Sequence, residues 1–327
     1  MSKRKNLVLL RSGVNSLHPK WLDRSSNRSF DVECISYQKN ADKCYPKEAQ
    51  DSCTYYPGSK WEGIYNWCNE NEELINLYEY IWLPDDDIMT SHSDINTLFE
   101  MCSSFDLKLA QPSLSKESYY SHIITKKHPS FFIRWTNFVE VMVPIFHISL
   151  FKKCIDTFSL NKSGWGIEYL WSQRCENIPG DIAIFDNIEV HHTRAVSSAG
   201  SGMSNSENKN LPHHEANVLF MHKAFNPRLD NICGISTNGN FLTLSDKNFH
   251  ILITDDAFVC GLDKHPIYDK YGNFISAHNK YMSYCRSSLD NQIAINQCQL
   301  SEEFINATMM CSLKASFAQT SPSPTNR

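Results

Sequence analysis

Short apolar runs that alternate with amphipathic segments mark the first 195 residues of the chain. The run Asn6–Leu10 is apolar between flanking charge and a Ser-Gly pair, which is typical of a strand buried on both faces. The pattern predicts strands over residues 6–10, 29–37, 78–83, 107–111, 138–146 and 181–190. It predicts helices over residues 60–69 with an extension over 72–77, from the capping pair Ser93-Asp94 to 104, over 149–158 and over 167–175.

This alternation of strands and helices predicts an α/β domain built on a mostly parallel sheet with helices on its faces. The segment 197–210 has no periodicity and few apolar residues, as is typical of a loop or linker. Beyond it, we expect a helix over 215–225 and short strands within 232–262. The predicted organisation is therefore a domain over 1–196, a linker over 197–214, a smaller C-terminal α+β extension over 215–316 and a disordered tail over 317–327.

Composition and charge exclude several classes of protein. With 41% hydrophobic and 12% aromatic residues, the chain can bury a sizeable core, which excludes a disordered protein. A net charge of −5 gives no footprint for nucleic acid or for an anionic membrane. Any phosphorylated ligand must therefore be held by a local site.

The cysteines and the first residues bear on the cellular compartment. None of the twelve cysteines is spaced as CxxC, which excludes a zinc ribbon and a thioredoxin motif. We expect reduced thiols, with a secreted disulfide framework as the alternative. The apolar stretch 7–10 is too short for a signal peptide, and no run approaches the ~18 apolar residues that span a bilayer. We therefore expect a cytoplasmic protein, with peripheral attachment to the inner face of a membrane left open.

The acidic run Asp85-Asp86-Asp87 follows the predicted strand 78–83 directly. Adjacent carboxylates repel one another unless water or a cation compensates them, and ligands of open α/β sheets bind beyond the carboxyl ends of the strands. Hard oxygen ligands at that place suit Mg²⁺ or Mn²⁺, which would neutralise a diphosphate. The alternative is an exposed acidic turn.

Three further polar positions stand out. His191 and His192 follow the predicted strand 181–190, where an imidazole could complete a cation's coordination and Arg194 could contact a phosphate; a surface turn is the alternative. In the turn Gly164-Trp165-Gly166, the Trp165 indole offers a face on which a sugar ring could stack. Glu168 either serves this site or only begins a helix. Glu140 lies in an apolar run, where it either faces solvent or points into a pocket that raises its pKa.

These motifs carry a family resemblance. Their order resembles the metal-dependent GT-A glycosyltransferases and, more narrowly, a plant and bacterial glycosyltransferase-like family of unknown function. That family's WDEDI-like, VEMMAP-like, WGLD-like and late HHTRP motifs appear here as PDDDI (84–88), VEVMVP (139–144), WGIE (165–168) and HTRA (192–195). The likeness covers about residues 5–200. Ala195 departs from the usual proline, and Glu168 from the common aspartate.

The resemblance implies a GT-A-like fold and a role for each matching residue. Asp87 would ligate the metal, and Asp85 would reach the metal through water or contact the donor ribose. His192 would be the late metal ligand, with His191 as the alternative. Asp86, the acid that we expect to matter least, would lie with Arg194 and Trp165 on the donor side. Glu168 and Glu140 would line the acceptor side, one of them as the general base of an inverting displacement.

The function that follows is a glycosyltransferase of polysaccharide biosynthesis. It would use Mn²⁺ or Mg²⁺ to move a sugar from a nucleotide-diphosphate donor, with UDP-sugars favoured by their general abundance, to a hydroxyl of a glycan or lipid-linked glycan. A metal-dependent phosphoesterase or nucleotidyltransferase is one alternative, because it could use the same residues. A non-catalytic nucleotide-sugar-binding module is another. The pattern leaves the sugar, the acceptor and the oligomeric state open.

Overall fold

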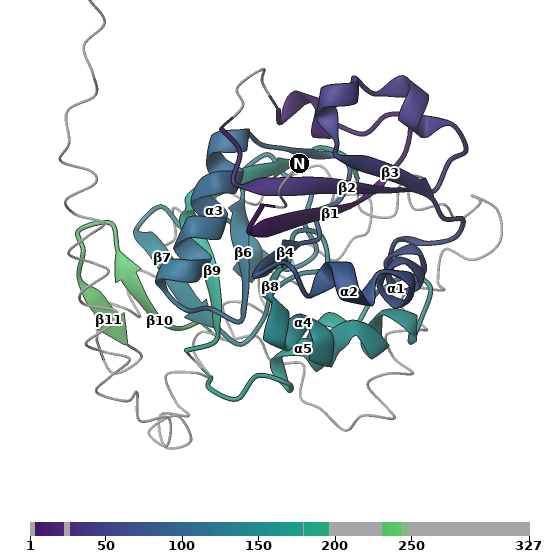
Figure 1. Ribbon diagram of the computed structural model, residues 1–327. Helices are drawn as coiled ribbons and strands as arrows, with labels where there is room; N and C mark the ends of the chain where they lie inside the picture. Colours follow the sequence, from purple (N-terminus) through teal and green to yellow (C-terminus); the bar gives the residue numbers. More distant parts are fainter. Residues whose placement is uncertain (1–3, 23–26, 179, 196–230, 244–245, 247–327) are drawn as a thin grey trace, which may run out of the picture.

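A single mixed sheet forms the centre of the molecule. The computed structural model describes residues 4–22, 27–178, 180–195, 231–243 and 246. The strands are β1 (Asn6–Ser12), β2 (Phe30–Ser36), β3 (Ser52–Tyr55), β4 (Tyr80–Trp82), β5 (Ile88–Met89), β6 (Leu109–Leu114), β7 (Phe131–Thr136), β8 (Ile145–His147), β9 (Ile182–His192), β10 (Asn231–Ser236) and β11 (Phe241–Thr243). Their order is β11-β10-β7-β9-β6-β8-β4-β1-β2-β3, and β5 pairs with β9 off this path. β3 and β11 lie at opposite ends of the sheet (Figure 1).

The sheet is mixed, and it is mostly parallel in its core. β3, β2, β1 and β4 are parallel neighbours, and β6 pairs with β9 in parallel. The short strand β8 lies between β4 and β6 and is antiparallel to both. Beyond β9, the strands β7, β10 and β11 pair antiparallel in turn. The predicted α/β fold with a mostly parallel sheet is confirmed, and the arrangement is consistent with a GT-A-like sheet.

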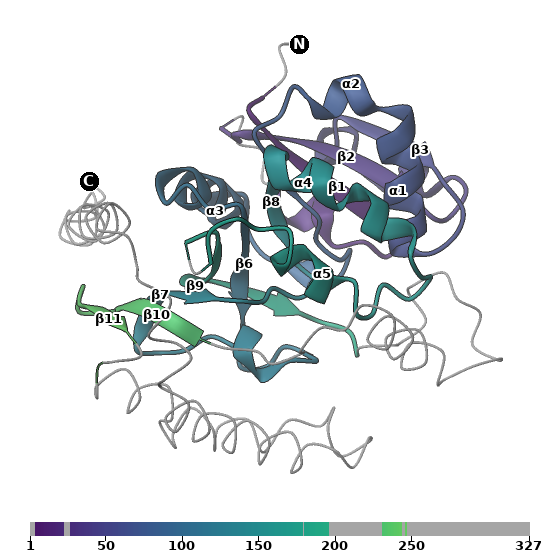
Figure 2. The same cartoon turned by 90° about the horizontal axis from the view of Figure 1, so that it is seen from below.

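Helices cover both faces of this sheet (Figures 1 and 2). The α-helices are α1 (Lys60–Glu70), α2 (Glu72–Ile75), α3 (His92–Ser104), α4 (Ile148–Cys154) and α5 (Glu168–Ser172). Short 3₁₀ helices are η1 (His18–Lys20), η2 (Ala41–Cys44), η3 (Lys47–Ala49), η4 (Ile123–Thr125) and η5 (Ile155–Ser159). The helices predicted near 60–69, 149–158 and 167–175 are therefore present, although the last is shorter than predicted.

Strand β1 shows how the core divides into two layers. Val8 and Leu10 pack in the cluster that contains the apolar side of α3, including Phe99. Leu7 and Leu9 point to the other face, into a cluster with residues of α1, α4 and α5. Successive side chains of a strand point to opposite faces, so a strand covered on both sides must be apolar throughout. The continuous apolar run at the start of the chain has this cause.

The prediction of a strand over 138–146 is wrong except at its end, where residues 145–146 belong to β8. The chain forms β7 before this segment and β8 at its end, and residues 137–144 form an irregular connection. Val139 and Val143 are nevertheless fully buried. The Leu83 and Asp85 N–H groups donate to the carbonyls of Pro144 and Met142. Burial of this loop between other elements, and not ladder pairing, accounts for its apolar residues.

Three element ends differ from the prediction. β6 continues through Pro112 to Leu114, with a register shift after the proline, where a missing N–H is tolerated. Helix α3 begins two residues earlier than the pair Ser93-Asp94 predicts, because Ser91 is its N-cap. β9 extends to His192, because β5 pairs with its last two residues.

Part of the predicted C-terminal extension joins the central sheet. Strand β10 pairs with β7 and β11 pairs with β10, so these residues extend the sheet beyond β9. The predicted linker at 197–214, the helix at 215–225 and the tail at 317–327 lie outside the described residues, and the division into domains stays a prediction. Among the described helices, none combines the length and apolarity that crossing a bilayer requires.

Candidate functional site

The pairing of β5 with the end of β9 brings the acidic run and the histidines together. Ile88 lies opposite His192 in this short antiparallel ladder. The Asp87 carbonyl accepts hydrogen bonds from the Thr193 backbone N–H (3.2 Å) and hydroxyl (2.8 Å). The Asp85 N–H donates to the Met142 carbonyl (2.8 Å), which fixes the other side of the acidic loop. Residues more than a hundred positions apart therefore meet at one edge of the sheet.

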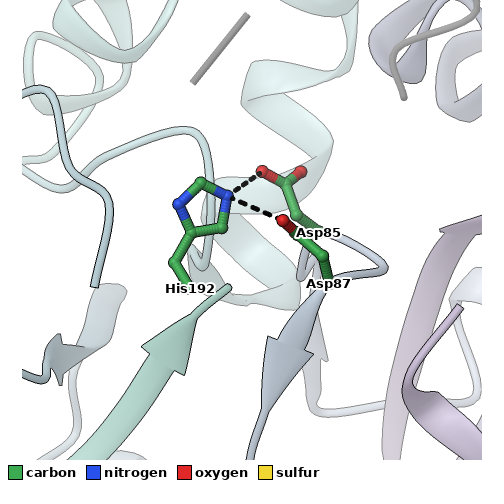
Figure 3. A group of neighbouring side chains, drawn as sticks. All are labelled: Asp85, Asp87 and His192. Carbon is green, nitrogen blue, oxygen red and sulfur yellow. Dashed lines mark ion pairs between the residues drawn. The ribbon is translucent and has the colours of Figure 1, made fainter. Parts of the chain in front are cut away.

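Asp85, Asp87 and His192 form the central cluster of the site (Figure 3). Each offers one ligand atom, and these atoms all lie within 4.8 Å of one another. His192 Nε2 lies 3.3 Å from Asp87 Oδ2 and 3.9 Å from Asp85 Oδ2. Asp87 and His192 are buried, whereas the Asp85 side chain is 27% exposed. Two oxygens and one imidazole nitrogen are a donor set that Mn²⁺ accepts, with Mg²⁺ the less nitrogen-tolerant choice.

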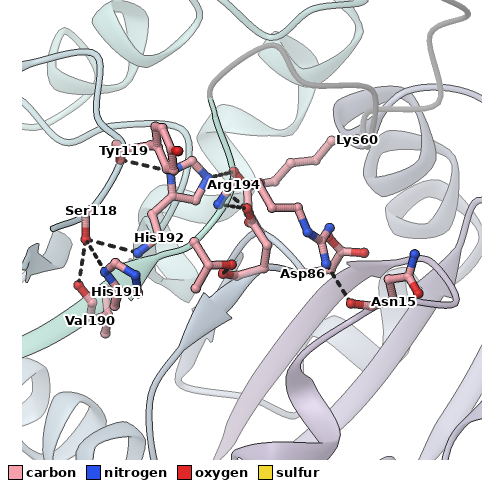
Figure 4. A network of polar contacts seen from close by, with 12 residues as sticks. Asn15, Lys60, Asp86, Ser118, Tyr119, Val190, His191, His192 and Arg194 are labelled. Atoms are coloured by element: carbon pink, nitrogen blue, oxygen red, sulfur yellow. Dashed lines mark hydrogen bonds and ion pairs between the residues drawn. The ribbon is translucent and has the colours of Figure 1, made fainter. Parts of the chain in front are cut away.

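A backbone carbonyl fixes the orientation of the His192 ring (Figure 4). His192 Nδ1 lies 2.9 Å from the Tyr119 carbonyl oxygen. Since a carbonyl can only accept, Nδ1 carries the hydrogen, and Nε2 is directed at the aspartates. Metal-ligating histidines usually hold their second nitrogen in this way. The ring is thus positioned for a cation as well as for an ion pair.

The charges of the cluster are strongly coupled. Burial lowers the pKa of His192, but the hydrogen bond and charge of Asp87 outweigh burial and raise it to about 9. Burial likewise acts to raise the pKa of Asp87, and the contact with His192 overrides it, so that the pKa lies below its usual value. An imidazolium here compensates the carboxylates. A metal ion that replaced the imidazolium proton would use the same atoms.

His191 points away from this cluster. Its Nδ1 lies 2.9 Å from the Ser115 hydroxyl, on the opposite face of β9 from the aspartates. The His192 N–H in turn donates to the Ser118 hydroxyl (3.0 Å), as Figure 4 shows. Of the two candidate imidazoles, the structure therefore brings His192 to the acidic loop.

Asp86 has a different environment from its neighbours. Its carboxylate is buried and accepts hydrogen bonds from the Gly13 N–H (2.8 Å), from Arg194 Nη1 (2.9 Å) and from the Tyr37 hydroxyl (3.4 Å). Burial raises its pKa to about 6, against the opposing effect of the Gly13 N–H and of Arg194. Asp86 thus holds the loop after β1 against the end of β9.

Arg194 is the partner that completes this link. Besides its contact with Asp86, its Nη2 donates to the Asn15 carbonyl (2.6 Å), and its backbone N–H donates to Asp87 Oδ2 (3.0 Å). The side chain is 30% exposed. The guanidinium is therefore already bound within the protein, and its predicted contact with a phosphate stays a prediction.

Lys60 is a site residue that the sequence analysis missed. Its Nζ donates to Asp85 Oδ1 (2.6 Å) and to the carbonyls of Val141 (2.7 Å) and Leu83 (3.0 Å). It is the first residue of α1, whose N-cap is Ser59. In an α/β sheet, a helix that connects two parallel strands begins at the edge where the strands' carboxyl ends lie and ligands bind. The place of Lys60 at the start of a predicted helix could therefore have indicated a site residue.

Glu140 is buried in the connection between β7 and β8. Its Oε1 accepts from the Ser121 N–H (3.2 Å) and its Oε2 from the Thr125 hydroxyl (3.1 Å). Its own N–H donates to Gln111 Oε1 (2.7 Å). Burial raises the pKa of the carboxyl to about 7. Of the two interpretations of this residue, the structure supports the buried one.

Glu168 is the first residue of α5 and is also buried. Its Oε1 lies 3.9 Å from His122 Nε2, and its Oε2 has no hydrogen-bond partner among the described residues. Burial, with the negative charge of Glu140 as a smaller cause, raises its pKa to about 8. Glu168 is thus both a helix-start residue and a buried carboxyl with one oxygen that has no hydrogen-bond partner among the described residues.

The turn before α5 depends on glycine. Gly164 and Gly166 have φ values of +77° and +90°. A Cβ atom at Gly164 would also lie 2.0 Å from Cδ1 of Trp61, so this position excludes any side chain. Trp165 is half-buried between the two glycines. The predicted stacking of a sugar on its indole stays a prediction.

The comparisons with known proteins identify solved structures but no family. No protein-family model and no curated protein matches the chain. The chain is similar to S. aureus TarS 1–349, at 9% identity and a TM-score of 0.39, over 91% of this chain and 93% of that one. It is also similar to S. aureus TarS 1–349 in complex with UDP-GlcNAc, at 8% identity and a TM-score of 0.46, over 97% of this chain and 92% of that one. The similarity to S. aureus TarS has 9% identity and a TM-score of 0.38, over 88% of this chain and 55% of that one. At these scores, the description of the fold rests on the strand order alone.

Proposed function

We propose that this chain is a metal-dependent glycosyltransferase. A Mn²⁺ or Mg²⁺ ion held by Asp85, Asp87 and His192 would bind a nucleotide-diphosphate sugar, whose sugar passes to a hydroxyl of a glycan or lipid-linked glycan. The observation that carries this proposal is the convergence of these three side chains at the carboxyl ends of β4 and β9. The four motifs of the family resemblance lie in the acidic loop, the connection before β8, the turn before α5 and the end of β9.

The residues present fit such an ion. Their oxygen and nitrogen atoms lie within 4.8 Å of one another, and the Tyr119 carbonyl orients the His192 ring. When bound, the ion acts as a Lewis acid that stabilises the negative charge of the departing nucleoside diphosphate. Asp85, at the exposed side of the cluster, is the ligand nearest to an incoming donor, and Lys60 holds its second oxygen in place.

The two buried glutamates supply the acceptor side of the proposed reaction. Glu140 uses both oxygens to accept hydrogen bonds from Ser121 and Thr125, whereas Glu168 keeps Oε2 without a partner among the described residues. We therefore assign to Glu168 the contact with the acceptor hydroxyl. A pKa of about 8 suits a general base, because a base works best when its pKa lies near the operating pH.

Metal-dependent donor binding tests the proposal. Calorimetry measures the affinity for UDP and for UDP-sugars, with and without Mn²⁺, in the wild type and in Asp87→Asn. We expect Mn²⁺ to tighten binding in the wild type, and Asp87→Asn to weaken the Mn²⁺-dependent affinity at least about tenfold, since a ligand is lost without a change of shape. Asp106→Asn, at an exposed aspartate, is the matched control and should bind as the wild type does. Equal nucleotide affinity with and without Mn²⁺ would contradict the proposal.

Turnover distinguishes transfer from hydrolysis. With a panel of nucleotide sugars and hydroxyl acceptors, a transferase releases nucleoside diphosphate much faster when an acceptor is present. Cleavage of a phosphate bond at the same rate without an acceptor would favour a phosphoesterase that uses the same ligands. Donor binding without turnover under either condition would favour a binding module.

A further inference from the structure

Two cysteines lie side by side on neighbouring strands and are not part of the cluster of Asp85, Asp87 and His192. Cys34 of β2 and Cys53 of β3 are register partners in a parallel pair. Cys53 packs against the same hydrophobic cluster that contains Cys34, so both side chains point to one face of the sheet. Both are free thiols. β3 is the last strand on its side of the sheet, and no other strand of the described residues covers it.

We propose that Cys34 and Cys53 are a redox-active dithiol that closes to an intramolecular disulfide when a small-molecule disulfide such as oxidised glutathione acts on it. This site does not depend on the proposed transferase activity. Neighbouring strands lie about 4.8 Å apart, and a disulfide joins Cα atoms about 4.4–6.8 Å apart. The register pairing of Cys34 with Cys53 therefore places their Cα atoms within the range that a disulfide spans.

The two thiols have unequal environments, which assigns each a role. Cys53 is half-buried on the edge strand, whereas Cys34 is 1% exposed, with its Sγ 3.6 Å from His18 Nε2. The hydrogen bond between the thiols lowers the pKa of Cys53 and raises the pKa of Cys34, and burial raises the latter further. The thiolate is the attacking form, so Cys53 reacts first and Cys34 second.

The exchange proceeds in two balanced steps. The Cys53 thiolate attacks one sulfur of oxidised glutathione, which forms a mixed disulfide and releases one glutathione thiolate. The Cys34 sulfur then gives up its proton and attacks Cys53 Sγ, which breaks the mixed disulfide and releases the second glutathione. The protein thiols lose two electrons, oxidised glutathione gains them, and the two thiol protons end on the two glutathione molecules.

The bridge would act on the segment between β2 and β3. This segment contacts the loop after β1, because the Tyr45 hydroxyl donates to the Gly13 carbonyl and Gln50 Oε1 lies 3.2 Å from His18 Nε2. The Gly13 N–H in turn donates to Asp86. A disulfide would close the segment into a covalent ring, so oxidation constrains a part of the chain that is joined to the acidic loop.

Redox titration of the full chain tests the proposal. The protein is equilibrated in glutathione buffers from reducing to oxidising, free thiols are blocked by alkylation, and peptides are analysed by mass spectrometry. We expect a peptide that joins Cys34 to Cys53, two hydrogens lighter than the reduced pair, which dithiothreitol reverses. Cys53→Ser, which changes a half-exposed side chain, should abolish the bridge and leave the near-ultraviolet circular dichroism unchanged.

The matched control is Cys44→Ser, because Cys44 is exposed and lies in the same segment. This variant should form the Cys34–Cys53 bridge as the wild type does. The proposal is overturned if both thiols stay open to alkylation in the most oxidising buffer. It is also overturned if Cys53 pairs with Cys44 instead, or if the bridge signal persists in Cys53→Ser.

Discussion

Glu140 and Glu168 are two carboxyl groups whose pKa values burial raises into the range around neutral pH. Burial is the largest cause at both, and it raises their pKa values to about 7 and about 8. The negative charge of Glu140 also raises the pKa of Glu168. Around neutral pH the pair therefore holds on to protons that exposed glutamates would have lost.

This pair predicts the pH dependence of stability. The ordinary pKa of Glu168 is 4.5, so the unfolded chain ionises above this value while the folded carboxyl stays protonated up to about 8. The stabilising contribution is fully present below 4.5 and is lost as the pH rises through about 8. Urea denaturation from about pH 5 to about pH 8 should show a falling free energy of unfolding, and Glu168→Gln should flatten that fall by at least about 1 kcal/mol.

The exposed Glu100 provides the control for this measurement. Glu100→Gln should leave the slope of stability against pH as it is in the wild type. Parallel slopes for the wild type and Glu168→Gln would show that the Glu168 carboxyl titrates normally in the folded protein.

Some site residues could be predicted one by one, and others could not. Asp85, Asp87 and His192 follow strand ends that the apolar pattern locates, and strand ends of a parallel sheet share one edge. The choice between His191 and His192 depends on the register in which β5 pairs with β9, which no local pattern encodes. The ion pair of Lys60 with Asp85 joins two segments that meet only in the folded sheet.

At the scale of single elements, helix α3 shows how a local ambiguity is resolved. Two serines precede its apolar face, and the sequence pattern favoured Ser93 with Asp94 as the start. In the structure the Ser91 hydroxyl accepts from the Asp94 N–H (3.1 Å) and donates to the Asp94 carboxylate (2.7 Å). The N-cap therefore lies two residues earlier than predicted, and Asp94, in the first turn, forms hydrogen bonds with it.

The two serines give a direct comparison. Ser91→Ala removes the cap and should lower the free energy of unfolding by about 1 kcal/mol. Ser93→Ala changes an exposed residue inside the helix and should alter stability by less than about 0.5 kcal/mol. Thermal or urea denaturation of both variants decides the matter, and a larger loss in Ser93→Ala would place the helix start where the sequence pattern put it.

Elements are hardest to predict where a segment is buried but does not pair with a neighbouring strand. The apolar residues of 138–146 have the composition of a strand, yet most of this segment is a buried connection. A buried loop needs apolar side chains as much as a strand does, provided that its backbone groups find partners. Here the Met142 and Pro144 carbonyls find them in the N–H groups of Asp85 and Leu83.

For the molecule as a whole, a buried ion pair joins neighbouring strands in the part of the sheet beyond β6. Arg134 of β7 binds Asp186 of β9 through Nε (2.6 Å) and Nη2 (2.9 Å), and both side chains are fully buried. Its Nη1 also donates to Asn231 of β10 (3.0 Å). Three strands from distant parts of the chain are therefore joined by one guanidinium.

Removal of this guanidinium should affect the entire fold. Arg134→Met leaves the Asp186 carboxylate buried without its partner and should lower the free energy of unfolding by about 3–5 kcal/mol. Arg174→Met removes an arginine from a partly exposed pair with Asp156 and should cost less than about 1 kcal/mol. Urea denaturation of both variants measures the difference, and equal losses would show that the buried pair does not join the strands energetically.

The sheet as a whole was partly predictable. The alternation of apolar runs and helices was enough for a mostly parallel α/β sheet. It gave no sign that β8 inserts antiparallel between β4 and β6, or that β10 and β11 extend the same sheet. Such pairings depend on which edge is open once the central strands have formed.

The candidate metal site also has a place in the order of synthesis. A ribosome releases the chain from its amino end, so Asp85 and Asp87 emerge long before His192, the last of the three side chains. A nascent chain that ends before β9 lacks the imidazole and also the strand that aligns the acidic loop through β5. Binding of a cation at this candidate site would therefore follow synthesis of β9, the strand that supplies both the imidazole and the pairing partner of β5.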